Sequence, residues 1–221
     1  MGTMRRPAPL FADRVDAGRL LGQALEAERE DAVVVGLARG GVVVAAEVAS
    51  RLALPLDVVA VRKVRHPWQP EYALGAVTPG DGVYVRGPDG LTDAQVQAAV
   101  DAAAGAAAEL DRRLHAAVPP LDLAGRTAVL VDDGLATGAT MVAAVRWARA
   151  RGAARVVVAV PVGAVESLAA LEGEADAVVC PYPLDQFVAV GLWYGSFAPV
   201  GDEEVERLLA AGRSTPQGAA S

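Results

Sequence analysis

The feature that most constrains this sequence is a regular alternation between short valine-rich runs and longer alanine-rich stretches. The valine-rich runs are apolar on successive residues, which is typical of strands that are covered on both faces. Strands are predicted at 33–36, 57–61, 127–131, 155–160 and 177–179, and helices at 16–27, 42–52, 93–118, 139–151, 164–172 and 202–210. This order predicts an α/β fold with a doubly wound, mainly parallel sheet and helices on both faces.

The composition fits a single domain of this class, which we assign to residues 1–213. Hydrophobic residues make up 53% of the 221 residues and aromatic residues only 5%, so the core must consist largely of Val, Ala and Leu. Two segments interrupt the rhythm: an irregular, proline-rich insertion at 62–90 with a hairpin strand at 83–85, and a small irregular C-terminal hood at 181–200. The insertion is a candidate active-site loop, and we expect residues 65–73 to close over a substrate. The tail at 214–221 is expected to be disordered.

Charge, cysteine content and hydropathy limit the partners of this chain. Its net charge of −7 disfavours binding to nucleic acid, which requires a basic surface. The single cysteine, Cys180, cannot form an internal disulfide and favours a reducing compartment. The longest apolar stretches are too short to span a membrane, and no apolar segment follows Arg5 and Arg6. We therefore expect a cytoplasmic protein without a membrane or nucleic-acid partner.

Residues 129–140 carry the strongest functional signal. An apolar strand leads directly into Asp132 and Asp133, and a helix begins after a loop of small and hydroxyl residues: Gly134, Leu135, Ala136, Thr137, Gly138, Ala139 and Thr140. Backbone N–H groups at the start of that helix, together with the threonine hydroxyls, predict a site for a phosphate monoester. Two adjacent carboxylates repel each other, so they need a cation or hydroxyl donors, such as Mg²⁺ and a sugar diol. An ordinary helix cap would need only one of the two acids.

The same residues resemble the signature of the type I phosphoribosyltransferases along its full length. The departure is Ala139, where many family members have a second glycine. Residues 70–77 and 189–194 resemble an uncharacterised subgroup of predicted phosphoribosyltransferases, so the resemblance covers most of residues 10–210. It implies a Mg²⁺-dependent transfer of a 5-phosphoribosyl group from 5-phosphoribosyl 1-diphosphate (PRPP) to a small-molecule acceptor, usually a base nitrogen. Asp132 and Asp133 would then hold the ribose, with Mg²⁺ near them directly or through water or substrate, and residues 134–140 would bind the 5′-phosphate.

The resemblance also implies where the diphosphate binds. In the family, the loop after the first strand holds it through backbone amides and often a basic side chain. Here that loop contains Ala38, Arg39, Gly40 and Gly41. Lys63 and Arg65 alternate with their neighbours after the second strand, so both should project to one side. Family members often have a basic residue here, although a solvated basic strand end is the plain alternative. Asp132, Asp133, Arg39 and Lys63 form the expected catalytic set.

The acceptor is the least constrained part of this hypothesis. In the 6-oxopurine transferases a carboxylate precedes the Thr-Gly pair of the phosphate loop, and this chain has Ala136 there, so hypoxanthine and guanine lose support. Glu71 and Asp185 are candidate general bases. Phe187, Trp193 and Tyr194 could stack on a flat base, or they could instead pack the hood against the core. A homodimer is also left open.

Two functions of other classes stay open. A non-catalytic regulator that senses PRPP or a nucleotide would retain the same site without turnover. A dinucleotide-binding oxidoreductase would use the glycine-rich turn at 36–41, which lacks the full G-x-G-x-x-G spacing. The oxidoreductase hypothesis leaves residues 132–140 unexplained.

Overall fold

The structure is a computed structural model that describes residues 8–213. Within that range the central sheet consists of five parallel strands. Their spatial order is β2 (Leu56–Ala60), β1 (Ala32–Ala38), β6 (Thr127–Val131), β7 (Arg155–Ala159) and β9 (Ala177–Val179). All five predicted strands are confirmed, with shifts of one or two residues at some ends.

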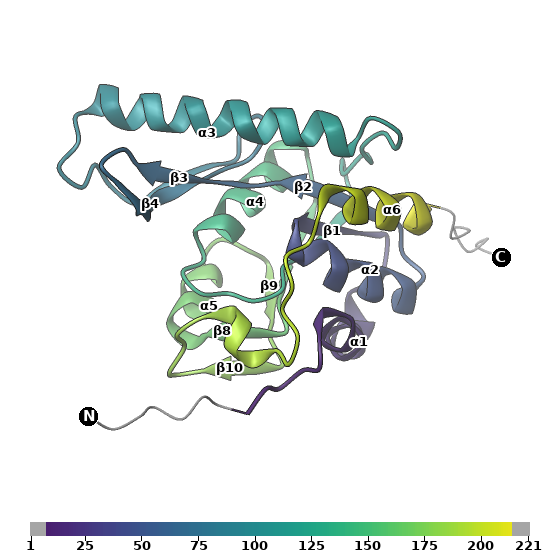
Figure 1. Ribbon diagram of the computed structural model, residues 1–221. Coiled ribbons are helices and arrows are strands. Elements are labelled where there is room, and N and C mark those ends of the chain that lie inside the picture. The colour runs from purple at the N-terminus through teal and green to yellow at the C-terminus, as the bar shows by residue number, and fades with distance from the viewer. Residues whose placement is uncertain (1–7, 214–221) are drawn as a thin grey trace.

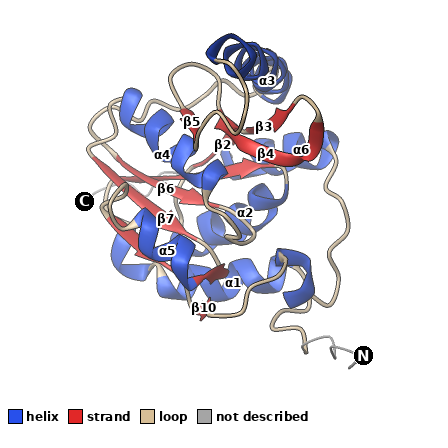
Figure 2. Ribbon diagram, turned by 90° about the vertical axis from the view of Figure 1, so that its left-hand side faces the viewer, coloured by secondary structure: helices blue, strands red, loops and turns tan. Residues whose placement is uncertain are grey.

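Helices cover both faces of this sheet, as predicted (Figure 2). One face packs against α1 (Arg14–Ala24), α2 (Gly40–Leu52) and α6 (Asp202–Arg213), and the other against α4 (Ala139–Ala150) and α5 (Val165–Leu171). Strand β1 shows why both faces of the sheet must be covered, because its successive side chains enter different hydrophobic cores. Val34 joins the cluster that contains α2, whereas Val33 and Val35 join the cluster that contains α4. Both cores are built mainly from Val, Ala and Leu, as the composition predicts.

The insertion at 62–90 is regular, and the expectation of an irregular segment was wrong. It forms an antiparallel three-stranded sheet of β3 (Arg62–His66), β4 (Gln69–Val77) and β5 (Val83–Val85). Its prolines lie in the turns or near strand ends, where a missing N–H group costs little, so they delimit the strands. The long helix α3 (Asp93–Leu114) packs on this sheet through a separate small core, and the two form an arm beside the body (Figure 1).

The hood also contains regular elements that the sequence did not predict. Strand β10 (Tyr182–Leu184) pairs in parallel with β8 (Val162–Ala164), and a 3₁₀ turn, η2, spans Val190–Trp193. The chain before α1 packs against the hood, because the N–H groups of Leu10 and Phe11 donate to the carbonyl of Trp193 at 2.8 and 3.1 Å. The hood is thereby joined to the start of the chain.

Helix α3 begins where the sequence predicts and ends earlier. Thr92 and Gln95 form the predicted capping box at its start. The helix ends at Leu114 rather than at residue 118, because His115 caps it and directs its ring towards Asp57. Another short 3₁₀ turn, η1 (Glu26–Glu28), follows α1. The predicted disordered tail lies outside the described residues, and within them no helix is both long and apolar enough to cross a membrane.

Candidate active site

The candidate site lies where the carboxyl ends of β1 and β6 meet. These strands are neighbours, with Gly36 opposite Val131, so the turn after β1 and the acidic pair after β6 come together. A Cβ atom on Gly41 would lie 2.6 Å from the carbonyl oxygen of Val131, and one on Gly40 would lie 2.1 Å from Asp133 Oδ2. Both positions therefore require glycine, because only a bare Cα allows α2 to begin this close to the acidic pair.

Asp132 and Asp133 are two neighbouring buried carboxylates, and an ion pair with Arg14 compensates the charge of Asp133. Burial and then the neighbouring charge of Asp133 raise the pKa of Asp132 well above its usual range, although the Asp133 N–H donates to Asp132 Oδ1 at 2.9 Å. Burial also raises the pKa of Asp133, against the opposing effect of Arg14. Arg14 Nε donates to Asp133 Oδ2 at 2.7 Å. Such a pair favours a ligand that brings hydroxyl donors or positive charge.

A cavity of about 280 Å³ brings several predicted residues together. Asp132 lines it from the end of β6 and Thr140 from the start of α4. Lys63 and Arg65 line it from β3, and Ala38 lines it from the turn after β1. Lys63 and Arg65 are exposed while Val64 between them is buried, so the predicted alternation is confirmed. The cavity thus contains a carboxylate, a hydroxyl and three cations, because Arg62 of β3 also lines it.

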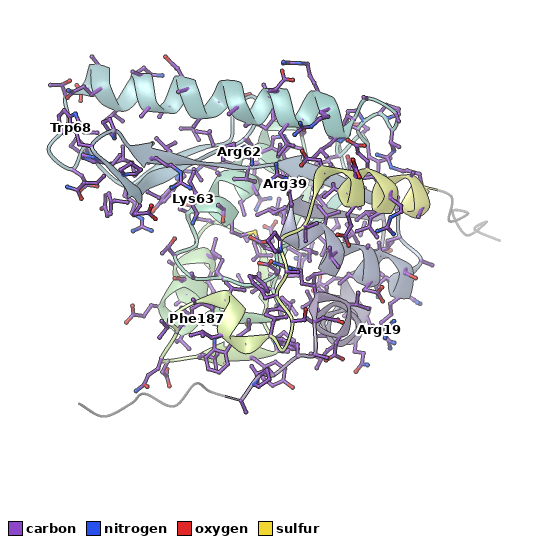
Figure 3. All side chains as sticks on the ribbon, in the orientation of Figure 1. Arg19, Arg39, Arg62, Lys63, Trp68 and Phe187 are labelled. Carbon is purple, nitrogen blue, oxygen red and sulfur yellow. The ribbon has the colours of Figure 1, made fainter. Side chains whose placement is uncertain are left out.

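Arg39 does not line this cavity. Its guanidinium Nε donates to Asp202 at the start of α6, and Arg113 of α3 pairs with the same carboxylate. Figure 3 shows Arg39 beside the start of α6, near Arg62 and Lys63. Burial, followed by the charge of Arg39, lowers the pKa of Arg62, which also lines the cavity. Arg39, Arg113 and Arg62 therefore all act on the one carboxylate of Asp202, and together they lower its pKa.

The loop at 134–140 leads into the start of α4, and its backbone is held in place by strand-like pairing. Leu135 anchors it, because its N–H donates to the carbonyl of Val162 and its carbonyl accepts from Ala164, both at 2.9 Å. Helix α4 begins after Gly138, whose φ of +75° favours glycine, and no side chain caps its first turn. Ala136 and Thr137 are exposed. The first N–H groups of α4 are therefore available to a ligand.

A second cavity, of about 370 Å³, borders the same loop at Ala136 and Thr137. Ala136 and Thr137 line it together with Phe187 and Asp185 of the hood and Arg86, which follows β5. Two cavities thus border residues 136–140, one lined by Lys63 and Arg65 and the other by residues of the hood.

The remaining predicted acceptor residues lie elsewhere. Tyr194 is 1% exposed, and its hydroxyl donates to the carbonyl of Asp133 at 2.5 Å, so its ring presents no face to a base in this structure. Trp193 packs in the cluster that joins the hood to Phe11. Glu71 is an exposed residue of β4 and lines neither cavity.

Sequence reasoning missed several charged residues around the site, among them Arg14, Arg62, Arg86 and Asp202. Arg14 and Asp202 are separated from their partners by 119 and 163 positions, and each resembles an ordinary polar residue in the first turn of a helix. Arg86 adjoins a predicted strand, but no local pattern connects it to the loop at 134–140. Only the fold reveals these contacts.

Residues 11–191 match the family described as "Phosphoribosyl transferase domain". Putative phosphoribosyl transferases MT0597 and Rv0571c, from two strains of Mycobacterium tuberculosis, are each 48% identical to the chain over 206 residues. That match covers 90% of this chain and 46% of each relative, so the chain spans about half the length of the curated relatives it matches. The crystal structure of TT1426 from Thermus thermophilus superimposes with a TM-score of 0.77 at 44% identity, covering 91% of this chain and 98% of that chain.

Proposed function

The chain belongs to the phosphoribosyl transferase domain family, and we propose that it transfers a 5-phosphoribosyl group from PRPP to a nitrogenous base, with release of diphosphate. The observation that carries this proposal is the 280 Å³ cavity. It contains a carboxylate, a hydroxyl at a helix N-terminus and three cations, which are the groups that a ribose, a phosphate and a diphosphate would need.

In the proposed reaction each of these groups has a different role. The bond between the anomeric carbon and the diphosphate oxygen breaks, a bond to the acceptor nitrogen forms, and that nitrogen loses its proton. Charge develops on the leaving diphosphate and on the ribose ring. Lys63 and Arg65 would stabilise the diphosphate, and Arg39 would join them if it exchanged Asp202 for the ligand. Asp132 would hold the ribose hydroxyls in line while the loop at 134–140 holds the 5′-phosphate.

The residues present fit a magnesium ion that arrives with its substrate. Among the described residues, no group of three or more His, Cys, Asp and Glu side chains could hold a metal. Mg²⁺ needs no such cage, because it keeps several waters and binds one or two carboxylates together with substrate oxygens. Asp132 would be the protein's carboxylate ligand for Mg²⁺, either directly or through a water molecule. When bound, the ion would offset the negative charge of the diphosphate.

The acceptor is proposed to approach from the second cavity. Phe187 and Asp185 line that cavity opposite Ala136 and Thr137, so an aromatic ring and a carboxylate lie within one site. A flat heterocycle could stack on Phe187, and Asp185 could accept the proton that the attacking nitrogen loses. Glu71, Trp193 and Tyr194 are less suited, since they lie outside both cavities.

Calorimetric titration with PRPP tests the donor site. The wild type is titrated with and without Mg²⁺ and compared with Asp132→Ala/Asp133→Ala. The exposed Asp101→Ala on α3 is the control for loss of a carboxylate. Saturable binding that Mg²⁺ strengthens, and that only the double variant loses, is expected. A panel of bases scored by release of diphosphate then identifies the acceptor.

The outcomes separate the competing functions. No binding at millimolar PRPP by the folded wild type would refute the donor assignment. Binding without diphosphate release for any base would favour the sensing regulator over the enzyme.

A further inference from the structure

The two acidic residues after β6 have different surroundings. Asp132 lines the 280 Å³ cavity with Thr140 and Lys63, whereas Asp133 does not line it. Asp133 faces Arg14 instead, and their side chains are only 14% and 11% exposed. One carboxylate of the pair is thus open to a ligand and the other is committed to an ion pair within the protein.

Arg14 is held on three sides. Its Nε donates to Asp133 Oδ2 at 2.7 Å, and its Nη1 donates to the carbonyl of Ala198 at 2.8 Å. The guanidinium carbon lies 3.8 Å from the centre of the Phe197 ring, a cation–π contact. An arginine fixed in this way presents its N–H groups in one orientation, so it can fix the carboxylate that it binds.

The constraint on Asp133 continues to Asp132 through the backbone. The hydroxyl of Tyr194 donates to the Asp133 carbonyl at 2.5 Å, while the Asp133 N–H donates to Asp132 Oδ1 at 2.9 Å. Gly40 leaves the space for this arrangement, because a Cβ atom there would lie 2.1 Å from Asp133 Oδ2 and 3.0 Å from Arg14 Nε. Arg14, Asp133 and Asp132 therefore form a continuous chain of contacts that ends at the cavity.

We propose that Arg14 is a positioning residue, which fixes Asp133 and thereby aims Asp132, the only one of the two acids that contacts the ribose of PRPP. This inference rests on the proposed function, because it names PRPP as the ligand. It assigns unequal roles to two residues that are adjacent in sequence and identical in type.

The test is a double-mutant cycle read as PRPP affinity at fixed Mg²⁺. The variants are Arg14→Gln, Asp133→Asn, their combination and Asp132→Asn. The control is Arg19→Gln, since Arg19 lies on the same helix but is 69% exposed and pairs with Glu47 (Figure 3). Thermal unfolding of each variant verifies that it is folded at the titration temperature.

We expect Asp132→Asn to lower the affinity about a hundredfold and Arg14→Gln and Asp133→Asn each about tenfold, as for a small misplacement of a binding group. The combination should be no weaker than the weaker single variant, because residues in one chain of contacts are not additive. Arg14→Lys keeps the charge but loses the planar fork of N–H donors and the contact with Phe197, so it should lose about as much affinity as Arg14→Gln. Arg19→Gln should bind as the wild type does.

Three results would overturn the inference. The first is wild-type affinity in Arg14→Gln, and the second is additive losses in the combination. The third is a loss in Asp133→Asn as large as that in Asp132→Asn, which would place Asp133 on the ligand.

If the wild type itself binds no PRPP, the proposed function fails, and a crystal structure of Arg14→Gln decides the positioning role. Displacement of the Asp132 carboxylate from the Asp133 N–H would support that role, and an unmoved carboxylate would refute it.

Discussion

Raising the pH from 6.5 to 9 should destabilise the folded protein through His115, the residue that caps the C-terminus of α3 and does not line the cavity. Its Nε2 lies 3.1 Å from Asp57 Oδ1 and its Nδ1 lies 3.3 Å from Asp111 Oδ1. Both ring nitrogens face carboxylates, and only the protonated ring can donate from both. Asp57 is 1% exposed and also accepts from Arg213 and from the Leu121 N–H. The positive ring therefore compensates a buried negative charge.

The size of the effect follows from the pKa of His115. Burial alone would lower it, but hydrogen bonds to Asp111 and Asp57 and the charges of both carboxylates together raise it from 6.5 to about 9. At about 1.36 kcal/mol for each pKa unit, that difference corresponds to about 3 kcal/mol. Because the folded state has the higher pKa, this contribution is complete below pH 6.5 and is lost as the pH rises to about 9. A loss of this size is a large part of a typical stability of about 5–15 kcal/mol.

Urea unfolding, followed by tryptophan fluorescence at constant ionic strength, measures this dependence. The wild type should lose about 3 kcal/mol of unfolding free energy between pH 6.5 and 9, whereas His115→Gln should start lower and lose much less. Arg112→Gln is the control, because this residue lies on the last turn of the same helix but is exposed and pairs with the equally exposed Glu109. A flat wild-type profile, or an equal fall in His115→Gln, would refute the reasoning.

Three further predictions concern the site and its surroundings. Gly40→Ala should lower the melting temperature and abolish PRPP binding, because its Cβ atom would lie 2.1 Å from Asp133 Oδ2. Gly105→Ala on α3 is the control, because no atom lies within 4 Å of its Cβ, and it should raise the free energy of unfolding in urea by about 0.5–1 kcal/mol. Limited proteolysis between residues 65 and 73 should slow in the presence of Mg²⁺ and PRPP, and equal rates with and without them would exclude closure of this hairpin. Burial raises the pKa of the Cys180 thiol to about 11, so at pH 8 it should react with a disulfide reagent far more slowly in the folded protein than in urea, and equal rates would contradict its burial.

The sequence predicted the central sheet well because its signal is local. A strand that is buried on both faces must be apolar on successive residues, and the runs around Val33 and Val156 are short and rich in β-branched valine, which favours a strand over a buried helix. The insertion was harder to predict, because Pro67 and Pro79 mark turns without showing whether the residues between them pair. Pairing of Lys63 with Ala76 depends on tertiary contacts with α3 and α4, which no local pattern encodes.

The candidate site was predictable to a similar extent. Asp132, Thr140 and Lys63 were predicted from their places after strands or at a helix start, and the fold brings them to one cavity. Arg39 was placed correctly in the turn after β1, but its contact with Asp202 crosses 163 positions. A motif fixes the backbone position of a residue, whereas the direction of a long side chain depends on partners elsewhere in the chain.

No basic residue occurs in the loop that follows Asp133, residues 134–140, and this has a physical cause. A buried pair of carboxylates needs a positive charge, yet a loop that binds a phosphate at a helix N-terminus, as proposed for residues 134–140, has no room for a long cationic side chain. A lysine or arginine in that loop would place its own side chain at the proposed anion site. The charge therefore has to come from a distant segment, and here Arg14 provides it while Ala198 and Phe197 hold it in place. A phosphate loop of small residues beside an acidic pair thus implies a remote counter-ion, and only the fold identifies which residue it is.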